Sequence, residues 1–210
     1  MSNEISLCIL ARDEEHCIGT LISSLKNEVS EVLVIDDHSL DKTADLAIAA
    51  GARVIPLPFN LYDHGFAEAA NWMISCASST WVLIVDADEL VTEGQYLSSL
   101  VRTFDATTWA LPRRKWENWT LQVREEYEAY PDWQVRLINK QALKGPWFSG
   151  EMHVRFQYPE KVRRAFRGPH IEHLQHELRT TAKALHRADL YSNLATRQGV
   201  AIDGGSPLVK

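Results

Sequence analysis

The sequence predicts an α/β fold with a mostly parallel, Rossmann-like sheet that has helices on both faces, followed by a smaller α+β part. Three observations support this prediction. Short apolar runs alternate with helix-like segments over residues 1–100, acidic residues follow two of these runs, and the alternation stops beyond them. We therefore divide the chain into two halves of one domain, residues 1–100 and residues 101–210.

The first half opens with a buried apolar run, Ile5 to Ala11, which we interpret as a strand. In the next helix, apolar residues from Cys17 to Leu25 recur near the 3.6-residue period, and Asp13 is the expected N-cap. Five further elements are expected in alternation: strand Glu31–Ile35, helix Lys42–Ala50 closed by Gly51, strand Arg53–Leu57, helix Gly65–Ala77 and strand Trp81–Val85. Strands joined by helices in this order form parallel sheets.

The second half has a different pattern, in which tryptophans and prolines interrupt short strand-like pieces. The expected elements are strands Thr108–Leu111, Trp133–Asn139 and His153–Gln157, and a last helix at Glu177–Ala195. We expect this part to shape a second binding site beside the sheet.

The composition is that of a globular protein and excludes a disordered chain. The 22 basic and 28 acidic residues give a net charge of −6, which argues against a dedicated nucleic-acid binder. Three widely spaced cysteines suggest free thiols in a reducing compartment. With no apparent signal peptide or apolar run of about 20 residues, we expect a cytoplasmic protein, and peripheral membrane contact stays open.

Two expected strands end in acidic clusters, Asp36-Asp37 and Asp86-Ala87-Asp88. Parallel sheets bind ligands at the carboxyl ends of their strands. Carboxylates gathered there repel each other, and a cation or a hydrogen-bonding ligand is the usual reason for such a cluster. Carboxylates suit Mg2+ or Mn2+, and such an ion would attract a phosphate-bearing ligand.

Three segments carry a resemblance to a known family: residues 9–15 (ILARDEE), 34–43 (VIDDHSLDKT) and 81–89 (WVLIVDADE). In this order they resemble the N-terminal signatures of family 2 glycosyltransferases, which have the GT-A fold, and the third resembles that family's DxD motif. Residues 130–138 (YPDWQVRLI) and 150–153 (GEMH) are similar to the lipopolysaccharide-type β-glucosyltransferase branch.

The resemblance implies that the first half binds a nucleotide-sugar and the second half binds the acceptor. Ala11 and Arg12 would line the uracil base, and Asp36 or Asp37 would accept hydrogen bonds from the base or ribose. Asp86 would approach the ribose and the metal, and Asp88 would be the main metal ligand. The full implied donor-binding set is Ala11, Arg12, Glu14, Asp36, Asp37, Asn71, Asp86, Ala87 and Asp88.

The family's general base maps onto Asp132, the acid of an Asp-x-x-x-Arg segment that ends at Arg136. A late histidine often binds metal or diphosphate in the family, and the candidates are His153, His170, His173 and His176, of which we choose His173. On the acceptor side we expect Arg136, His153 and Trp133, since an aromatic ring offers a flat platform for a sugar.

The expected function is metal-dependent, inverting transfer of a hexose, with glucose as the expected sugar, from a UDP-sugar. The cofactor would be Mn2+ or Mg2+. The acceptor would be a hydroxyl of a carbohydrate, a lipid-linked molecule or another compound. The sequence does not identify it.

Two other functions share parts of this pattern. A nucleotidyltransferase has a similar sheet and metal-binding acids but usually a glycine-rich loop after its first strand, and residues 11–15 contain no glycine. Residues 32–38 resemble the acidic strand of a phospho-aspartate receiver domain, but receivers begin with that strand, and here a strand and a helix precede it.

Overall fold

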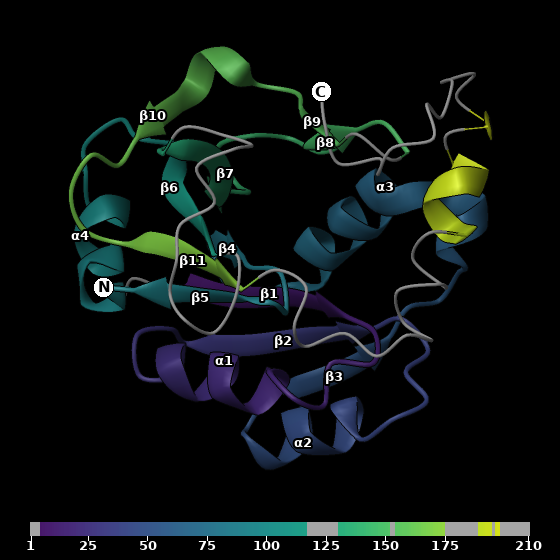
Figure 1. The fold of residues 1–210 in the computed structure, drawn as a ribbon. Helices are drawn as coiled ribbons and strands as arrows, with labels where there is room; N and C mark the ends of the chain where they lie inside the picture. The colour runs from purple at the N-terminus through teal and green to yellow at the C-terminus, as the bar shows by residue number, and fades with distance from the viewer. Residues whose placement is uncertain (1–4, 117–129, 152–153, 175–188, 195, 198–210) are drawn as a thin grey trace.

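The computed structural model of the chain describes residues 5–116, 130–151, 154–174, 189–194 and 196–197. Within these residues, one nine-stranded sheet forms the centre of the molecule (Figure 1). Its strands follow the order β3-β2-β1-β4-β7-β6-β11-β5, and β10 pairs with β6.

The first half confirms the predicted alternation. Its elements are β1 (Ile5–Ala11), α1 (Ile18–Leu25), β2 (Glu31–Asp36), α2 (Thr43–Ala49), β3 (Arg53–Pro56), α3 (Leu61–Cys76) and β4 (Trp81–Ile84). Strand β1 pairs in parallel with β2 and β4, and β2 pairs in parallel with β3. Helices α1 and α2 pack on one face of the sheet and α3 packs on the other, so each face has its own apolar core.

The second half extends the same sheet with mixed strand directions. Its elements are β5 (Glu89–Thr92), the 3-10 turn η1 (Gly94–Tyr96), α4 (Leu97–Val101), β6 (Thr108–Trp116), β7 (Asp132–Asn139), β8 (Phe148–Ser149), β9 (Arg155–Phe156), η2 (Pro159–Lys161), β10 (Val162–Arg164) and β11 (His170–Leu174). Strand β7 is antiparallel to β4 and β6, whereas β11 is parallel to β6 and antiparallel to β5.

Four of these strands, β5, β8, β10 and β11, were not predicted. Because β5 precedes residue 100 and pairs with β11, the two predicted halves share one sheet. The strand expected at His153–Gln157 is reduced to β9. Of the helix expected at Glu177–Ala195, residues 189–194 are helical, and most of the rest lies outside the described residues.

Strand β7 contains an irregularity at Arg136. Trp109 of β6 lies opposite Leu137 and the next residue, Ala110, lies opposite Val135, so Arg136 is an extra residue on β7. Such a β-bulge changes the direction of a side chain at the point where it occurs. Simple alternation along β7 therefore does not predict where Arg136 points.

The prediction that Asp13 is the N-cap of the first helix is wrong. Helix α1 begins at Ile18, and Cys17 at its N-cap makes no side-chain capping bond. Asp13 instead has a positive φ of 54°, and its carboxylate accepts a hydrogen bond from the Leu40 N–H at 2.7 Å. In the same loop the Glu14 N–H donates to Thr43 Oγ1 at 2.6 Å. These bonds tie the loop after β1 to the loop after β2 at one edge of the sheet.

Helix α3 is broken at Gly65, and we expect Gly65→Ala to destabilise the protein by about 3 kcal/mol or more. Its φ is 77°, and an added Cβ would lie 2.7 Å from Cα of Glu151, whose carbonyl accepts the Phe66 N–H at 2.8 Å. Gly51→Ala is the matched control, because Gly51 has a φ of 101° and no atom within 4 Å of the added Cβ. Thermal denaturation should show a much smaller loss for the control, and equal losses would contradict the close-approach argument.

Glu31 at the start of β2 is expected to make stability fall in acid. Burial acts to raise its pKa, but hydrogen bonds from Ser6, Ser78 and Arg53 lower the pKa from 4.5 to about 2. A lowered folded-state pKa stabilises the protein above pH 4.5, and this stability is lost as the pH falls toward 2.

We expect Glu31→Gln to lower the free energy of unfolding by about 1–2 kcal/mol at neutral pH, after allowing for solvent screening. The variant should also lose less stability than the wild type as the pH falls. Urea denaturation between neutral pH and pH 3 measures both effects. The exposed Glu28→Gln serves as the control and should change neither.

Candidate active site

The carboxylates predicted at the strand ends lie at one edge of the sheet. Asp36 ends β2, and Asp86 and Asp88 follow β4, while β1 lies between these two strands. The Asp37 N–H donates to the carbonyl of Ala11 at 2.8 Å, so the end of β1 holds the loop after β2. The order of strands therefore places one acidic cluster on each side of β1.

In the loops after β1 and β2, some buried polar side-chain atoms have no hydrogen-bond partner among the described residues. The Arg12 guanidinium lies 3.4 Å from Oδ2 of Asp37, which is almost fully buried. Asp36 accepts the Ser39 N–H at 3.2 Å through Oδ2. Within the described residues, Oδ1 of Asp36 and Nε of Arg12 are buried without a hydrogen-bond partner. Buried polar atoms of this kind are usually satisfied by a ligand or water.

Three other residues of the expected donor set have different surroundings. Glu14 accepts a hydrogen bond from the Cys17 thiol at 3.1 Å, and Ala87 is buried between the two aspartates. Asn71 does not face this edge with a free amide: its oxygen accepts the N–H groups of Trp147 and Phe148, both at 2.9 Å, and its NH2 donates to the Phe148 carbonyl. We therefore assign Asn71 to holding β8 against α3, which corrects the expected donor contact.

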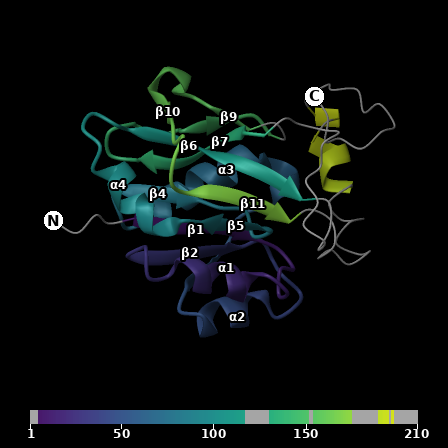
Figure 2. The same cartoon turned by 60° about the vertical axis from the view of Figure 1, so that its left-hand side comes forward.

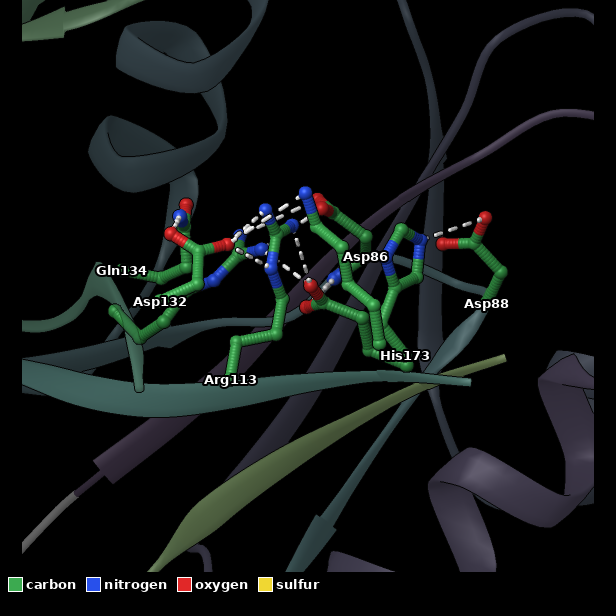
Figure 3. Close-up of polar contacts among 9 residues, drawn as sticks. Asp86, Asp88, Arg113, Asp132, Gln134 and His173 are labelled. Atoms are coloured by element: carbon green, nitrogen blue, oxygen red, sulfur yellow. Dashed lines mark hydrogen bonds and ion pairs between the residues drawn. The ribbon is translucent and has the colours of Figure 1, made fainter. Parts of the chain in front are cut away.

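Asp88 lies next to His173, as Figure 3 shows. Oδ2 of Asp88 is 3.4 Å from Nε2 of His173, which β11 delivers from the far end of the described chain. His173 is buried, and its Nδ1 has no partner within the described residues. The structure thus brings together two of the three side chains, Asp86, Asp88 and His173, that were expected as metal ligands.

These two side chains fit a metal ion that is shared with a ligand. Among the described residues, no three His, Cys, Asp or Glu side chains form a self-contained metal site. Mg2+ usually has one or two protein carboxylates and takes further ligands from substrate phosphates and water. The Asp88 carboxylate matches that pattern for Mg2+ and Mn2+, whereas the His173 imidazole is a nitrogen ligand outside it.

Asp86 is held by Arg136 and by a fully buried carboxylate, Glu89. The Arg136 guanidinium lies 2.8 Å from Oδ2 of Asp86 and 2.6 Å from Oε1 of Glu89, and Glu89 also accepts the Asp86 N–H at 3.1 Å. Desolvation acts to raise the pKa of Asp86, but the charge of Arg136 outweighs it and the pKa is lowered. The lowered pKa keeps the Asp86 carboxylate ionised at neutral pH. Because the side chain is 53% exposed, this carboxylate is also open to a ligand.

Arg136 was predicted on the acceptor side, and its contacts in the structure are with Asp86 and Glu89. The bulge on β7 directs it at Asp86 and Glu89, which raise its pKa against the effect of burial. Burial raises the pKa of Glu89 in turn, and the charges of Arg136 and Arg113 oppose that rise.

Asp132, the candidate base, lies at the other end of this group of charges (Figure 3). Its Oδ2 is 2.5 Å from the Arg113 guanidinium, and Oδ1 accepts a hydrogen bond from Gln134 at 2.7 Å. Desolvation acts to raise the pKa of Asp132, and Arg113 lowers it to below its ordinary value. Arg113 also reaches Glu89 at 3.3 Å, so Glu89 connects the surroundings of Asp86 and Asp132.

Trp133 does not share a face with Asp132, which corrects its expected position beside the base. Consecutive side chains of a strand point to opposite faces, and the Trp133 ring packs against Phe166 and Arg164. His153, the other residue expected on the acceptor side, lies outside the described residues.

Sequence reasoning missed Glu89, Arg113 and Gln134. Glu89 directly follows the acidic cluster and was given no role of its own, although it begins β5. Arg113 belongs to the short basic run Arg113-Arg114-Lys115. Its side chain is only 14% exposed, because β6 continues through it to Trp116. Gln134 is two residues after Asp132, and this strand spacing was the available signal.

Comparison with known proteins identifies the family. Residues 6–163, most of the chain, match the family model described as glycosyl transferase family 2. A stretch of 90 residues is 36% identical to an uncharacterized glycosyltransferase of Rickettsia typhi and covers 43% of this chain and 30% of that protein. A stretch of 86 residues is 35% identical to a TPR repeat-containing protein of Synechococcus elongatus and covers 41% of this chain and 21% of that protein. The chain thus spans less than a third of the length of these relatives.

Solved structures show the same fold. A glucosyl-3-phosphoglycerate synthase of Mycobacterium tuberculosis, in complex with Mn2+, UDP-glucose and phosphoglyceric acid, has a TM-score of 0.59 at 16% identity, with 97% of this chain and 82% of that chain covered. TarS of S. aureus has a TM-score of 0.60 at 14% identity, covering 95% and 40%. With the order of strands described above, these findings show that the chain belongs to glycosyl transferase family 2 and has the GT-A fold.

Proposed function

We propose that the chain transfers a hexosyl group from a UDP-sugar to an acceptor hydroxyl, with inversion at the anomeric carbon and with Mn2+ or Mg2+ bound at the site. The observation that carries this proposal is the Asp88–His173 pair beside Asp86, at the edge where Asp37 also lies. The mycobacterial neighbour, whose complex contains Mn2+ and UDP-glucose, supports the donor class and glucose as the sugar.

The donor-side residues have separable roles in this proposal. Arg12, Asp36 and Asp37 bind the nucleoside, with the unsatisfied Oδ1 of Asp36 as an acceptor for it. Asp88 and His173 hold the metal ion, and Asp86 binds beside it. When bound, the ion supplies Lewis-acid stabilisation of the leaving diphosphate.

On the acceptor side, Asp132 takes the proton from the attacking hydroxyl. Its lowered pKa keeps the carboxylate ionised at neutral pH, and Arg113 and Gln134 fix its orientation. A single base that acts on the acceptor, with no second carboxylate acting as a nucleophile, gives one displacement and hence inversion.

Asp132→Asn is therefore expected to lower kcat by about 10²–10⁴-fold while UDP affinity changes little, because the variant removes the proton acceptor, and the ionic partner of Arg113 with it, on the acceptor side. UDP release from candidate UDP-sugars measures the rate, and calorimetry with UDP measures the affinity. Asp105→Asn is the control, because Asp105 is exposed and Asn tolerates its φ of 59°. An unchanged rate in Asp132→Asn would rule out Asp132 as the base.

Thermal shift with UDP, in the presence and absence of Mn2+, tests the proposed function directly. Ligands that bind only the folded state raise its melting temperature. We expect a rise with UDP that depends on the metal ion, and a smaller rise with ADP. Absence of any response to nucleoside diphosphates would contradict the proposal.

The alternatives considered from the sequence have less support. In receiver domains the strands follow the order 2-1-3-4-5, whereas here β1 lies between β2 and β4 in a mixed sheet. The family match gives no support to nucleotidyl transfer. The likeness to the lipopolysaccharide-type β-glucosyltransferase branch and a cytoplasmic location remain proposals. No helix among the described residues is long and apolar enough to cross a membrane.

A further inference from the structure

An exposed group of aromatic rings and arginines lies on the face of β6 and β7 that is opposite to the Asp132 carboxylate. We call it the aromatic–arginine surface, and its members are Arg114, Tyr130, Trp133, Arg164 and Phe166. The Trp133 ring packs edge-on against Phe166 at 5.1 Å, and the Arg164 guanidinium lies 5.3 Å from the Trp133 ring centre. Arg114 lies 4.7 Å from the Tyr130 ring centre.

Two of the three rings of this surface are open to solvent, and Trp133 is half-buried. Phe166 is 78% exposed and Tyr130 is 46% exposed. Figure 2 shows that the strands carrying the surface, β6, β7 and β10, lie on the side of the molecule away from α1 and α2. A single exposed ring is common in soluble proteins, but several rings gathered with arginines mark an interaction surface.

The chain next to this surface is strongly basic. Residues 161–167 contain four basic residues and no acidic residue, although the whole chain has a net charge of −6. The four side chains, Lys161, Arg163, Arg164 and Arg167, are all exposed. Arg163 also donates hydrogen bonds to the carbonyls of Phe104 and Asp105, both at 3.4 Å, and this brings the 92% exposed Phe104 to the same edge.

We propose that the aromatic–arginine surface and residues 161–167 dock the chain on an anionic lipid bilayer. Trp, Tyr and Phe rings favour the headgroup region of a membrane, where a ring is partly buried and its polar neighbours stay in water. Lysines and arginines at the same level complement anionic headgroups. The acidic balance of the rest of the chain confines the attraction to this side.

The orientation that follows bears on the proposed reaction. Asp132 and Trp133 are consecutive residues of β7 whose side chains lie on opposite faces, so docking through Trp133 turns the Asp132 carboxylate away from the bilayer. This arrangement fits an acceptor that reaches Asp132 from the aqueous side. That consequence rests on the proposed function, whereas the docking itself does not.

Co-sedimentation of the full chain with vesicles tests the docking without any measurement of activity. We expect binding to vesicles of mixed phosphatidylglycerol and phosphatidylcholine, weaker binding at high salt, and little binding to phosphatidylcholine alone. Arg163→Gln combined with Arg167→Gln should weaken binding by about tenfold or more, since each basic residue near the surface contributes to the attraction.

Two further variants separate the possible causes. Phe166→Ser keeps every charge and should still weaken binding, most clearly at high salt, where insertion of the ring contributes most. Lys26→Gln combined with Lys144→Gln removes two exposed basic residues elsewhere and should leave binding unchanged. Circular dichroism should show the same folded spectrum for all variants.

Three results would overturn the proposal. These are no preference for anionic vesicles at low salt, an equal loss in the Lys26/Lys144 control, or tighter binding to a single-stranded oligonucleotide than to the vesicles. The last result would assign the surface to nucleic acid. The thermal shift with UDP is independent of all these measurements, so failure of the docking proposal and failure of the proposed function can be told apart.

Discussion

Asp88→Asn is expected to abolish the metal-dependent stabilisation by UDP and to lower kcat by at least about 10²-fold. Asp88 and His173 are the only pair that we assign to the metal ion, and their polar atoms lie 3.4 Å apart. Asparagine keeps the shape of the side chain but removes the charge that holds a divalent cation. Loss of the ion would remove the diphosphate contact together with the Lewis acid, so affinity and turnover should fall together.

Thermal shift with UDP and Mn2+ and turnover of UDP-sugars measure the two effects of Asp88→Asn. Asp45→Asn removes a charge from an exposed position in the first turn of α2 and is the matched control. The control should behave as the wild type in both assays. If Asp88→Asn kept the full metal-dependent shift, Asp88 would not be a metal ligand and the proposed donor site would need another acid.

Glu89→Gln is expected to destabilise the protein by about 3 kcal/mol or more and to lower kcat. The carboxylate of Glu89 is fully buried between Arg136 at 2.6 Å and Arg113 at 3.3 Å, and it accepts the Asp86 N–H. A neutral amide would leave the buried charge of Arg136 with Asp86 as its only acidic partner in the described structure. Removing one member of a buried ionic group costs much more than removing a surface pair, because the remaining charge stays desolvated.

The effect of Glu89→Gln on activity follows from geometry. Glu89 contacts both Arg136, which holds Asp86, and Arg113, which holds Asp132. We therefore expect kcat to fall more than UDP affinity, because the variant disturbs the alignment of the two sides. Urea denaturation and UDP calorimetry make this comparison. Glu68→Gln, in which a 54% exposed side chain lies 3.0 Å from the His64 ring in α3, should change stability by less than about 0.5 kcal/mol. A similarly small change in the stability of Glu89→Gln would contradict the proposal that Glu89 connects Arg136 and Arg113.

The parallel part of the sheet could be predicted because its signals are local. Strands β1, β2 and β4 are largely apolar runs, which is typical of strands buried on both faces, and a polar residue ends β2 or follows β1 and β4 within two positions. The site at their carboxyl ends follows from the same rule, so Asp36, Asp37, Asp86 and Asp88 could be selected without a structure.

The second half could not be predicted to the same extent, because its elements depend on distant pairing. Strand β5 is four residues long and begins with a glutamate, whose burial is possible only because Arg136 and Arg113 arrive from β7 and β6. The directions of Trp133 and Arg136 depend on register and on a bulge. A bulge is set by the partner strand, so the sequence of β7 alone does not reveal it.

The insertion of β11 between β6 and β5 has a consequence for biosynthesis. His173 lies opposite Glu89 in this pairing, so the Asp88–His173 contact joins residues that are far apart in the chain. On the ribosome, the strands that carry the aspartates emerge and can pair long before residues 170–174 are translated, and such long-range pairing is slow. The proposed metal site is therefore complete only after the late strand β11 has entered the sheet.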